Sequence, residues 1–214
     1  MLVRRFSMIR FILLGVFVAG LSGCGAVPSG SDGTPIDITA NPDQKEINDL
    51  PPIRFTKDGY DWVITPKAEY SLKGVVLKRT TYRTGWNSIL SPCDVAMAWG
   101  ELAQGDLYKQ LKWSQSNRWY FWKYGADFPK DNPFIIRYSS NTHIVPANPN
   151  LERAARSLKS GEPAELRGYL MRVDGKKGDE TRWWDSSLSR TDEGDGSCEL
   201  LYLKRLKADG KVYD

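Results

Sequence analysis

Three side chains in the second half of the chain have the chemistry of a nucleophilic site: His143, Cys198 and Arg205. An imidazole can take the proton of a thiol, the thiolate can attack a carbonyl carbon, and a guanidinium can stabilise the oxyanion that forms. His143 is the only histidine of the chain, so no Cys/His cluster with the spacing of a zinc site is present in the sequence. The alternative interpretation is structural, with His143 in a strand and its ring hydrogen-bonded to a neighbour.

The chain order of His143, Cys198 and Arg205 resembles that of sortase transpeptidases. The resemblance implies a cysteine-dependent acyl transferase acting on cell-wall peptides. The local sequence Gly196-Ser197-Cys198-Glu199 differs from the family in lacking a threonine before the nucleophile.

Other polar and aromatic side chains are candidates for binding rather than catalysis. If residues 141–145 form a strand, Asn141 and His143 share one face, and Arg190 and Asp192 could converge on them from the loop 186–197. Trp183 and Trp184 must point to opposite faces of a strand, so one of them is expected to be exposed. An exposed indole could bind the face of a sugar, whereas most of the other aromatic residues are expected to form core. We expect no metal and no cofactor.

The start of the chain is typical of an export signal. Arg4, Arg5 and Arg10 precede or begin an apolar run that continues to Gly20, and small residues follow it. Ten helical residues span only about 15 Å, which is too short for a bilayer core of about 30 Å.

The run ends in Leu21-Ser22-Gly23-Cys24, which resembles the lipobox of bacterial lipoproteins. The resemblance implies that residues 1–23 are a signal peptide, that cleavage precedes Cys24, and that Cys24 carries the lipid that anchors the protein to a membrane outside the cytoplasm. Gly25, in place of an aspartate, favours the periplasmic face of an outer membrane if the cell has one. Two or three acyl chains hold a protein firmly, because each buried methylene contributes about 0.8 kcal/mol.

Composition bounds the remaining chain. Without residues 1–23 the 30 basic residues become 27 against 26 acidic ones, a net charge of +1, so there is no basic face that would predict a nucleic-acid partner. Residues 24–50 are rich in small and polar residues and predict a flexible tether with a span of about 30 Å. Residues 51–214 have the length of a single domain.

Cys93 and Cys198 remain once Cys24 is lipidated. In an oxidising compartment we expect them to form a disulfide, which would close a loop of about 105 residues.

The expected elements are mainly strands, over 60–64, 70–82, 113–124, 134–138, 142–145, 163–173, 182–185 and 198–206. Ser91-Pro92-Cys93-Asp94 predicts the start of a short helix that ends near Gly100, and 106–111 predicts a second one. The clearest helix is predicted near 149–160, because apolar residues recur there at helical spacing. The fold class is therefore β-rich α+β. The order of the late elements predicts a small, partly open barrel that loosely resembles an OB-fold.

Four stretches resemble a set of conserved bacterial envelope proteins for which no activity is established: residues 91–100, 114–122, 140–147 and 186–192. The resemblance implies a recurring domain and no particular reaction. We therefore expect a non-catalytic binding or scaffolding module, membrane-anchored through Cys24, with an envelope protein or glycan as partner. The alternatives are the acyl transferase and a carbohydrate-binding module that uses an exposed tryptophan.

Overall fold

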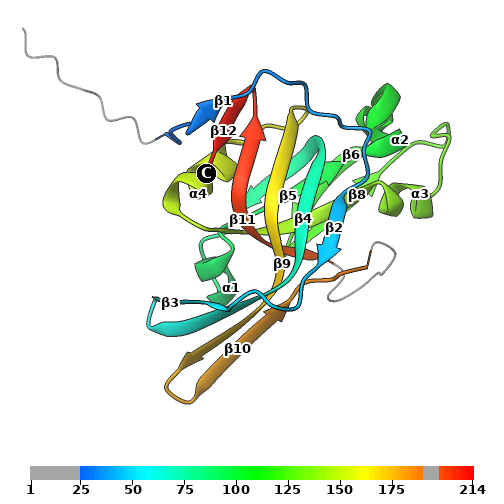
Figure 1. Cartoon of the computed structure of the whole chain (residues 1–214). Coiled ribbons are helices and arrows are strands. Elements are labelled where there is room, and N and C mark those ends of the chain that lie inside the picture. The colour runs from blue at the N-terminus through cyan, green and yellow to red at the C-terminus, as the bar shows by residue number, and fades with distance from the viewer. Residues whose placement is uncertain (1–24, 190–197) are drawn as a thin grey trace, which may run out of the picture.

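The computed structural model describes residues 25–189 and 198–214, and its strands form one large sheet and one separate hairpin (Figure 1). The strands are β1 Gly30–Ser31, β2 Asp43–Glu46, β3 Ile53–Lys57, β4 Tyr60–Thr81, β5 Cys93–Ala98, β6 Lys112–Ser116, β7 Trp119–Lys123, β8 Ser139–Pro146, β9 Pro163–Lys177, β10 Glu180–Asp185, β11 Glu199–Ala208 and β12 Lys211–Tyr213. The helices are α1 Trp86–Leu90, α2 Gly100–Ala103, a 3-10 helix Gln104–Gln110, α3 Asn132–Arg137 and α4 Pro149–Ser157.

A ring of hydrogen-bonded strands organises the fold. It runs β4–β5–β8–β11–β9 and returns to β4. Only the β8–β11 pairing is parallel, and α4 lies in the chain between β8 and β9. This is the connectivity expected of an OB-like ring, with the helix between the third and fourth strands. The prediction of a β-rich α+β fold with a partly open barrel is confirmed.

The core lies inside this ring. Burial alternates along the first part of the 22-residue strand β4, as the period of two residues in a strand requires. Leu72, Val95, Ile144, Leu166 and Leu201 each come from a different ring strand and belong to one buried cluster. The buried face of α4 joins the same cluster, so this helix closes one opening of the ring.

Helix α4 begins where the sequence predicts a helix. The side chain of Asn148 caps it by accepting a hydrogen bond from the N–H of Leu151 at 2.9 Å, and Pro149 occupies the first turn.

Two predicted elements are wrong in type. Residues 93–98, expected to be helical, form strand β5, and all six of its residues are buried between two packed layers. Residues 134–138, expected to be a strand, lie mainly in α3, where Asp131 accepts a hydrogen bond from the N–H of Phe134 at 3.0 Å. In both places local sequence signals competed, and packing decided the result.

The segment expected to be a flexible tether is attached to the domain from residue 26 onward. Strand β1 pairs with β12, and β2 pairs with β4. The buried amine of Lys207 holds the intervening chain through Asp32 at 2.7 Å and the carbonyl of Thr34 at 2.8 Å. The expectation of a free tether over 24–50 is corrected on this point, because backbone pairing and these polar contacts fix the segment. No helix within 25–189 and 198–214 is long and apolar enough to cross a membrane.

Candidate functional site

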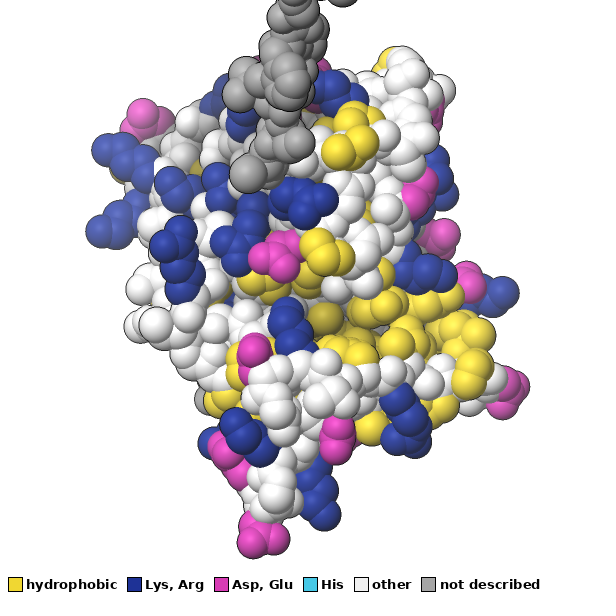
Figure 2. Space-filling model, turned by 90° about the vertical axis from the view of Figure 1, so that its left-hand side faces the viewer, with side chains coloured by type: hydrophobic (Ala, Val, Ile, Leu, Met, Phe, Trp, Pro, Cys, Tyr) yellow, Lys and Arg dark blue, Asp and Glu magenta, His cyan; other side chains and the backbone are white. Residues whose placement is uncertain are grey.

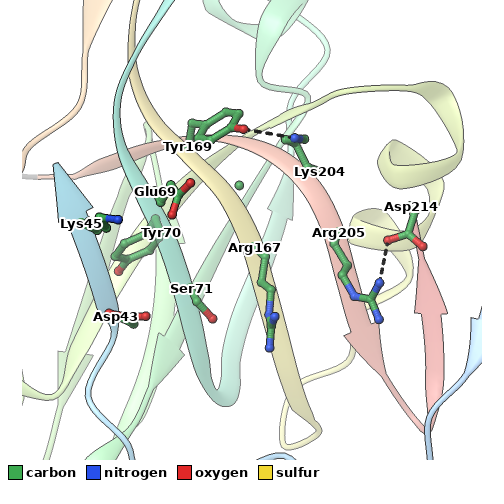
Figure 3. A pocket seen from close by; sticks show the side chains of 11 residues that line it. Asp43, Lys45, Glu69, Tyr70, Ser71, Arg167, Tyr169, Lys204, Arg205 and Asp214 are labelled. Atoms are coloured by element: carbon green, nitrogen blue, oxygen red, sulfur yellow. Dashed lines mark hydrogen bonds and ion pairs between the residues drawn. The ribbon is translucent and has the colours of Figure 1, made fainter. Parts of the chain in front are cut away.

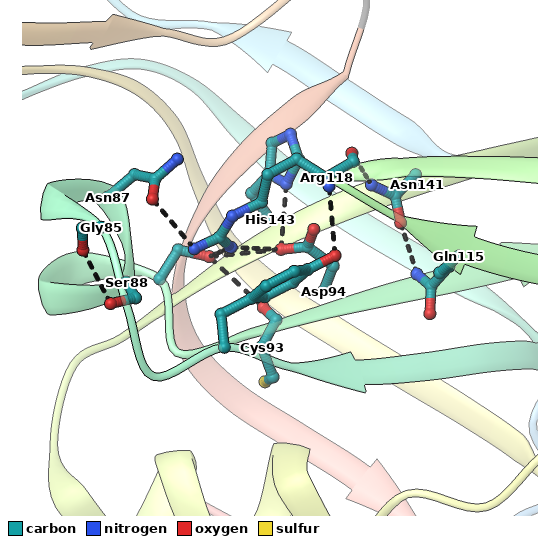
Figure 4. A network of polar contacts seen from close by, with 11 residues as sticks. Gly85, Asn87, Ser88, Cys93, Asp94, Gln115, Arg118, Asn141 and His143 are labelled. Atoms are coloured by element: carbon teal, nitrogen blue, oxygen red, sulfur yellow. Dashed lines mark hydrogen bonds and ion pairs between the residues drawn. The ribbon is translucent and has the colours of Figure 1, made fainter.

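A buried carboxylate lies on the outer side of the ring. Asp94 is fully buried on β5, opposite His143 on β8. The Nδ1 atom of His143 lies 3.0 Å from Oδ1 of Asp94, and Nη1 of Arg118 lies 2.8 Å from the same oxygen (Figure 4). A carboxylate in such a position requires a compensating charge, and Arg118 provides it.

The hairpin β6–β7 carries Arg118 to this carboxylate. Its two turn residues, Asn117 and Arg118, have φ values of +50° and +72°, which the twist of a two-residue hairpin favours but which arginine rarely adopts. The guanidinium lies 3.8 Å from the ring centre of Tyr82 and donates to Ser91 Oγ at 3.3 Å. The positive φ of Arg118 is therefore an unusual backbone conformation that places its guanidinium against the buried carboxylate of Asp94.

Asn141 joins the hairpin to the ring. Its amide donates to the carbonyl of Arg118 at 2.9 Å and accepts from Gln115 Nε2 at 2.6 Å. Asn141 shares a face with His143, as predicted, but only 1% of it is exposed. Its amide therefore positions the hairpin and does not face a ligand.

A row of aromatic rings continues from His143. The ring centre of His143 lies 4.6 Å from that of Trp184, Trp184 meets Trp86 edge to face at 6.1 Å, and Trp86 stacks on Trp62 at 6.3 Å. Gly175 makes room for this row, since a Cβ there would lie 2.2 Å from the Trp62 ring.

These groups surround a cavity of about 230 Å³. Its lining residues are Trp86, Asn87, Arg118, Trp119, His143, Trp184 and Cys198. Of these side chains only Arg118 carries a fixed charge, and Asp94 beneath it neutralises that charge. Oδ2 of Asp94 is buried without a hydrogen-bond partner among the described residues. The cavity thus offers aromatic faces, a few polar tips and no net charge.

The ionisation of Tyr82 reflects the same environment. Burial, with the negative charge of Asp94 beside it, raises the pKa of Tyr82 to about 12. Its hydroxyl therefore stays protonated, and it accepts a hydrogen bond from the N–H of Arg118 at 3.2 Å.

The two remaining cysteines do not form the predicted disulfide. Cys93 pairs with Ile144 of β8 on one side of that strand, and Cys198 immediately precedes β11 on the other. The two cysteines are therefore two strand spacings apart, or about 9.6 Å at about 4.8 Å per spacing. A disulfide can bridge a Cα separation of only about 7 Å. Cys93 also points into the ring core, whereas Cys198 lines the outer cavity. The prediction of a Cys93–Cys198 bond is therefore wrong.

Of the predicted acyl-transfer residues, the fold brings together His143 and Cys198, which line one cavity, but not Arg205. Arg205 donates to Asp214 at 3.3 Å and lines a separate hollow of about 620 Å³ formed on β2, β4, β9 and β11 (Figure 3). Arg205 follows Cys198 by seven residue steps of extended chain, which amounts to about 23 Å.

The other residues predicted to bind a ligand, Trp183, Trp184, Arg190 and Asp192, do not come together in one site among the described residues. Trp183 is 63% exposed and Trp184 is half-buried in the cavity wall, so the two indoles do point to opposite faces of β10. Arg190, Asp192 and Cys24, the predicted lipidation residue, lie outside the described residues. Within the described part of the chain no group of three His, Cys, Asp or Glu side chains could hold a metal ion.

Sequence reasoning missed Asp94 and Arg118, the two charges of the site. The sequence did carry one signal for Asp94, which is the single acid in the apolar run 93–98. An acid that is buried with such a run seldom lacks a partner, so a cation beside it could have been expected. No comparable signal marks Arg118, whose role depends on a turn and on a contact between distant strands.

Comparisons of the chain with protein-family models, with curated proteins and with solved structures found no match.

Proposed function

We propose that the chain is a cell-envelope lipoprotein, anchored by a lipid on Cys24, whose domain is a non-catalytic binding module. The tryptophan-walled cavity beside Asp94 is its ligand site. Gly25 favours the periplasmic face of an outer membrane where the cell has one. The observation that carries the proposal is the combination of three indoles, polar tips and a neutralised arginine in one small cavity.

The chemistry of the cavity favours an uncharged ligand with an apolar face. Arg118 is already paired with Asp94 at 2.8 Å, so an anionic ligand would have to compete with that carboxylate. The half-buried rings of Trp86 and Trp184 offer flat apolar surface, and Asn87 offers hydrogen bonds at the rim. A sugar ring of an envelope glycan has these properties, and the volume of about 230 Å³ is below the range of about 300–1,000 Å³ typical of larger ligands.

The neighbouring tryptophans provide a matched test. Neutral oligosaccharides of N-acetylglucosamine, the uncharged sugar of peptidoglycan, are titrated against the protein, and binding is followed by calorimetry. Trp184→Ala should weaken binding about tenfold or more, the equivalent of about 1.4 kcal/mol, whereas Trp183→Ala on the opposite face should leave it unchanged. Equal losses in both variants, or no binding by the wild-type protein, would contradict the glycan assignment.

One observation favours acyl transfer as a second candidate: His143 and Cys198 line the same cavity. Since Nδ1 of His143 faces Asp94, Nε2 is the nitrogen available to take the proton of the Cys198 thiol. The thiolate would attack a peptide carbonyl, and the leaving amine would receive that proton as the thioester forms. Such a cysteine should be alkylated rapidly at pH 6, and His143→Ala should abolish that reactivity. Slow alkylation at pH 6 that is independent of His143 supports the binding module instead.

A further inference from the structure

The first described residues are fastened to the domain by specific hydrogen bonds. The N–H of Val27 donates to Asn150 Oδ1 at 2.8 Å, and Asn150 Nδ2 donates to the carbonyl of Val27 at 2.7 Å. The N–H of Ser29 donates to the carbonyl of Val212 at 2.8 Å, and β1 then pairs with β12. Ala26 packs against the core cluster of the ring. The chain is therefore held from residue 26, beside the start of α4.

This attachment removes the slack expected between the lipid and the domain. Only Gly25 lies between Cys24 and Ala26, and two residue steps of extended chain span at most about 7 Å. A free coil of residues 24–50 would have spanned about 30 Å. A lipid on Cys24 thus brings the surface around Val27 directly to the bilayer.

The side chains around this attachment suit a headgroup layer. Arg153 is exposed on α4 and donates to Asn150 at 3.5 Å, and Lys211 is exposed opposite Ser31. Val27 is itself 66% exposed. The guanidinium of Arg205 reaches the carboxylate of Asp214, which also accepts from Ser29 Oγ at 2.7 Å.

The acids beside this attachment lie in ion pairs, and they are Asp32, Glu152, Asp209 and Asp214. Asp214 is bound by Arg205, and Asp209 lies 3.8 Å from Lys211. Figure 2 shows this side of the molecule, with more Lys and Arg than Asp and Glu on its upper half and with the largest hydrophobic patch at its lower right. Long basic side chains within a Debye length of about 8 Å of a phosphate layer are attracted to it.

We propose that this surface, the N-terminal face formed by Val27, Asn150, Arg153, Arg205 and Lys211, rests on the phosphate-bearing headgroups of the membrane that holds the lipid. The inference rests on the proposed anchor at Cys24. It adds to that anchor a fixed orientation: the domain lies against the bilayer by one face and does not swing on a tether.

The test uses the full-length lipidated protein in vesicles of phosphatidylethanolamine and phosphatidylglycerol that carry a nitroxide on the headgroup. In a Cys198→Ser background a fluorophore is attached at Lys211→Cys, or at Asp179→Cys in the turn between β9 and β10, which projects away from β1 in Figure 1. Quenching should be several-fold stronger at position 211 than at position 179. A flexible insert of about 15 residues between Gly25 and Ala26, spanning about 20 Å, should reduce the quenching at position 211.

The outcomes separate the two proposals. A protein that does not float with the vesicles refutes the anchor and, with it, the orientation. A protein that floats but is quenched equally at both positions refutes the orientation alone. Strong quenching at position 211 that survives the insert supports the contact of this face with the headgroups and overturns only the role given to the short link between Cys24 and Ala26.

Discussion

The ion pair of Asp94 and Arg118 joins a fully buried carboxylate to an arginine whose side chain is only 13% exposed. Removing the charge from water is costly, and the cost is offset only while the partner is present. Arg172 and Asp174 form a comparable contact at 2.8 Å with both side chains at least 40% exposed, where water screens the attraction. The two pairs differ in burial more than in distance, so their contributions to stability should differ.

Arg118→Ala should therefore lower the free energy of unfolding by about 3–5 kcal/mol, because it leaves Asp94 buried without its cation. Arg172→Ala should lower it by only about 0–1 kcal/mol. Urea denaturation of both variants measures the contrast. Similar losses in the two variants would show that the buried pair has no special role.

The two cysteines should differ sharply in reactivity. Burial, with Asp94 beside it, raises the pKa of Cys93 to about 12 from its ordinary value near 9. A thiol whose pKa is raised by folding contributes stability below pH 9, and this contribution is lost as the pH rises toward 12. At pH 8 iodoacetamide should modify Cys198 and leave Cys93 intact until urea is added. Mass spectrometry of the two peptides decides this, and native labelling of Cys93 would contradict its position in the core.

At the scale of elements, local signals succeeded where they agreed and failed where they competed. Asn148, Pro149 and the apolar spacing of 151–158 all favour a helix, and α4 forms. Ser91 and Pro92 also resemble a helix start, yet the next six residues are buried on both sides and form β5. A short apolar run fits either a buried strand or a buried helix, and only the neighbouring strands β4 and β8 decide between them.

The hairpin β6–β7 shows how an element outside the ring is held over the site. Asn141→Ala should remove its bonds to Gln115 and Arg118, lowering the free energy of unfolding by about 1–3 kcal/mol. Hydrogen exchange should accelerate over 112–123 while β4 and β9 stay protected. Gln115→Ala, which removes one of the two bonds, should have a smaller effect. Uniform acceleration across the ring would mean that Asn141 supports the whole fold and not the hairpin alone.

At the scale of the whole molecule, the late order of strand β8, helix α4 and strands β9, β10 and β11 was predictable because each of these elements carries its own pattern. The closure of the ring was not, because it depends on contacts between residues far apart in the chain. The candidate site shows the same limit. His143 and Trp184 could be proposed from residue type, whereas their meeting with Arg118 depends on a hairpin turn that crosses the outside of β5 and β8.

Gly168 lies where β9 meets β11 and the ring closes. The register shifts between Leu203 and Arg205, and a Cβ on Gly168 would lie 1.9 Å from the carbonyl oxygen of Tyr202. Backbone cannot yield as a flexible side chain can, so Gly168→Ala should push the two strands apart and lower the free energy of unfolding by about 1–3 kcal/mol.

Gly125→Ala is the matched control, because nothing lies within 4 Å of the added Cβ and the backbone there needs no positive φ. It should change stability by no more than about 0.5 kcal/mol. Thermal unfolding compares the two variants, and amide exchange locates the weakened strands. If Gly168→Ala proves as stable as Gly125→Ala, the β9–β11 seam is open in solution, and the five strands form a curved sheet without a closed ring.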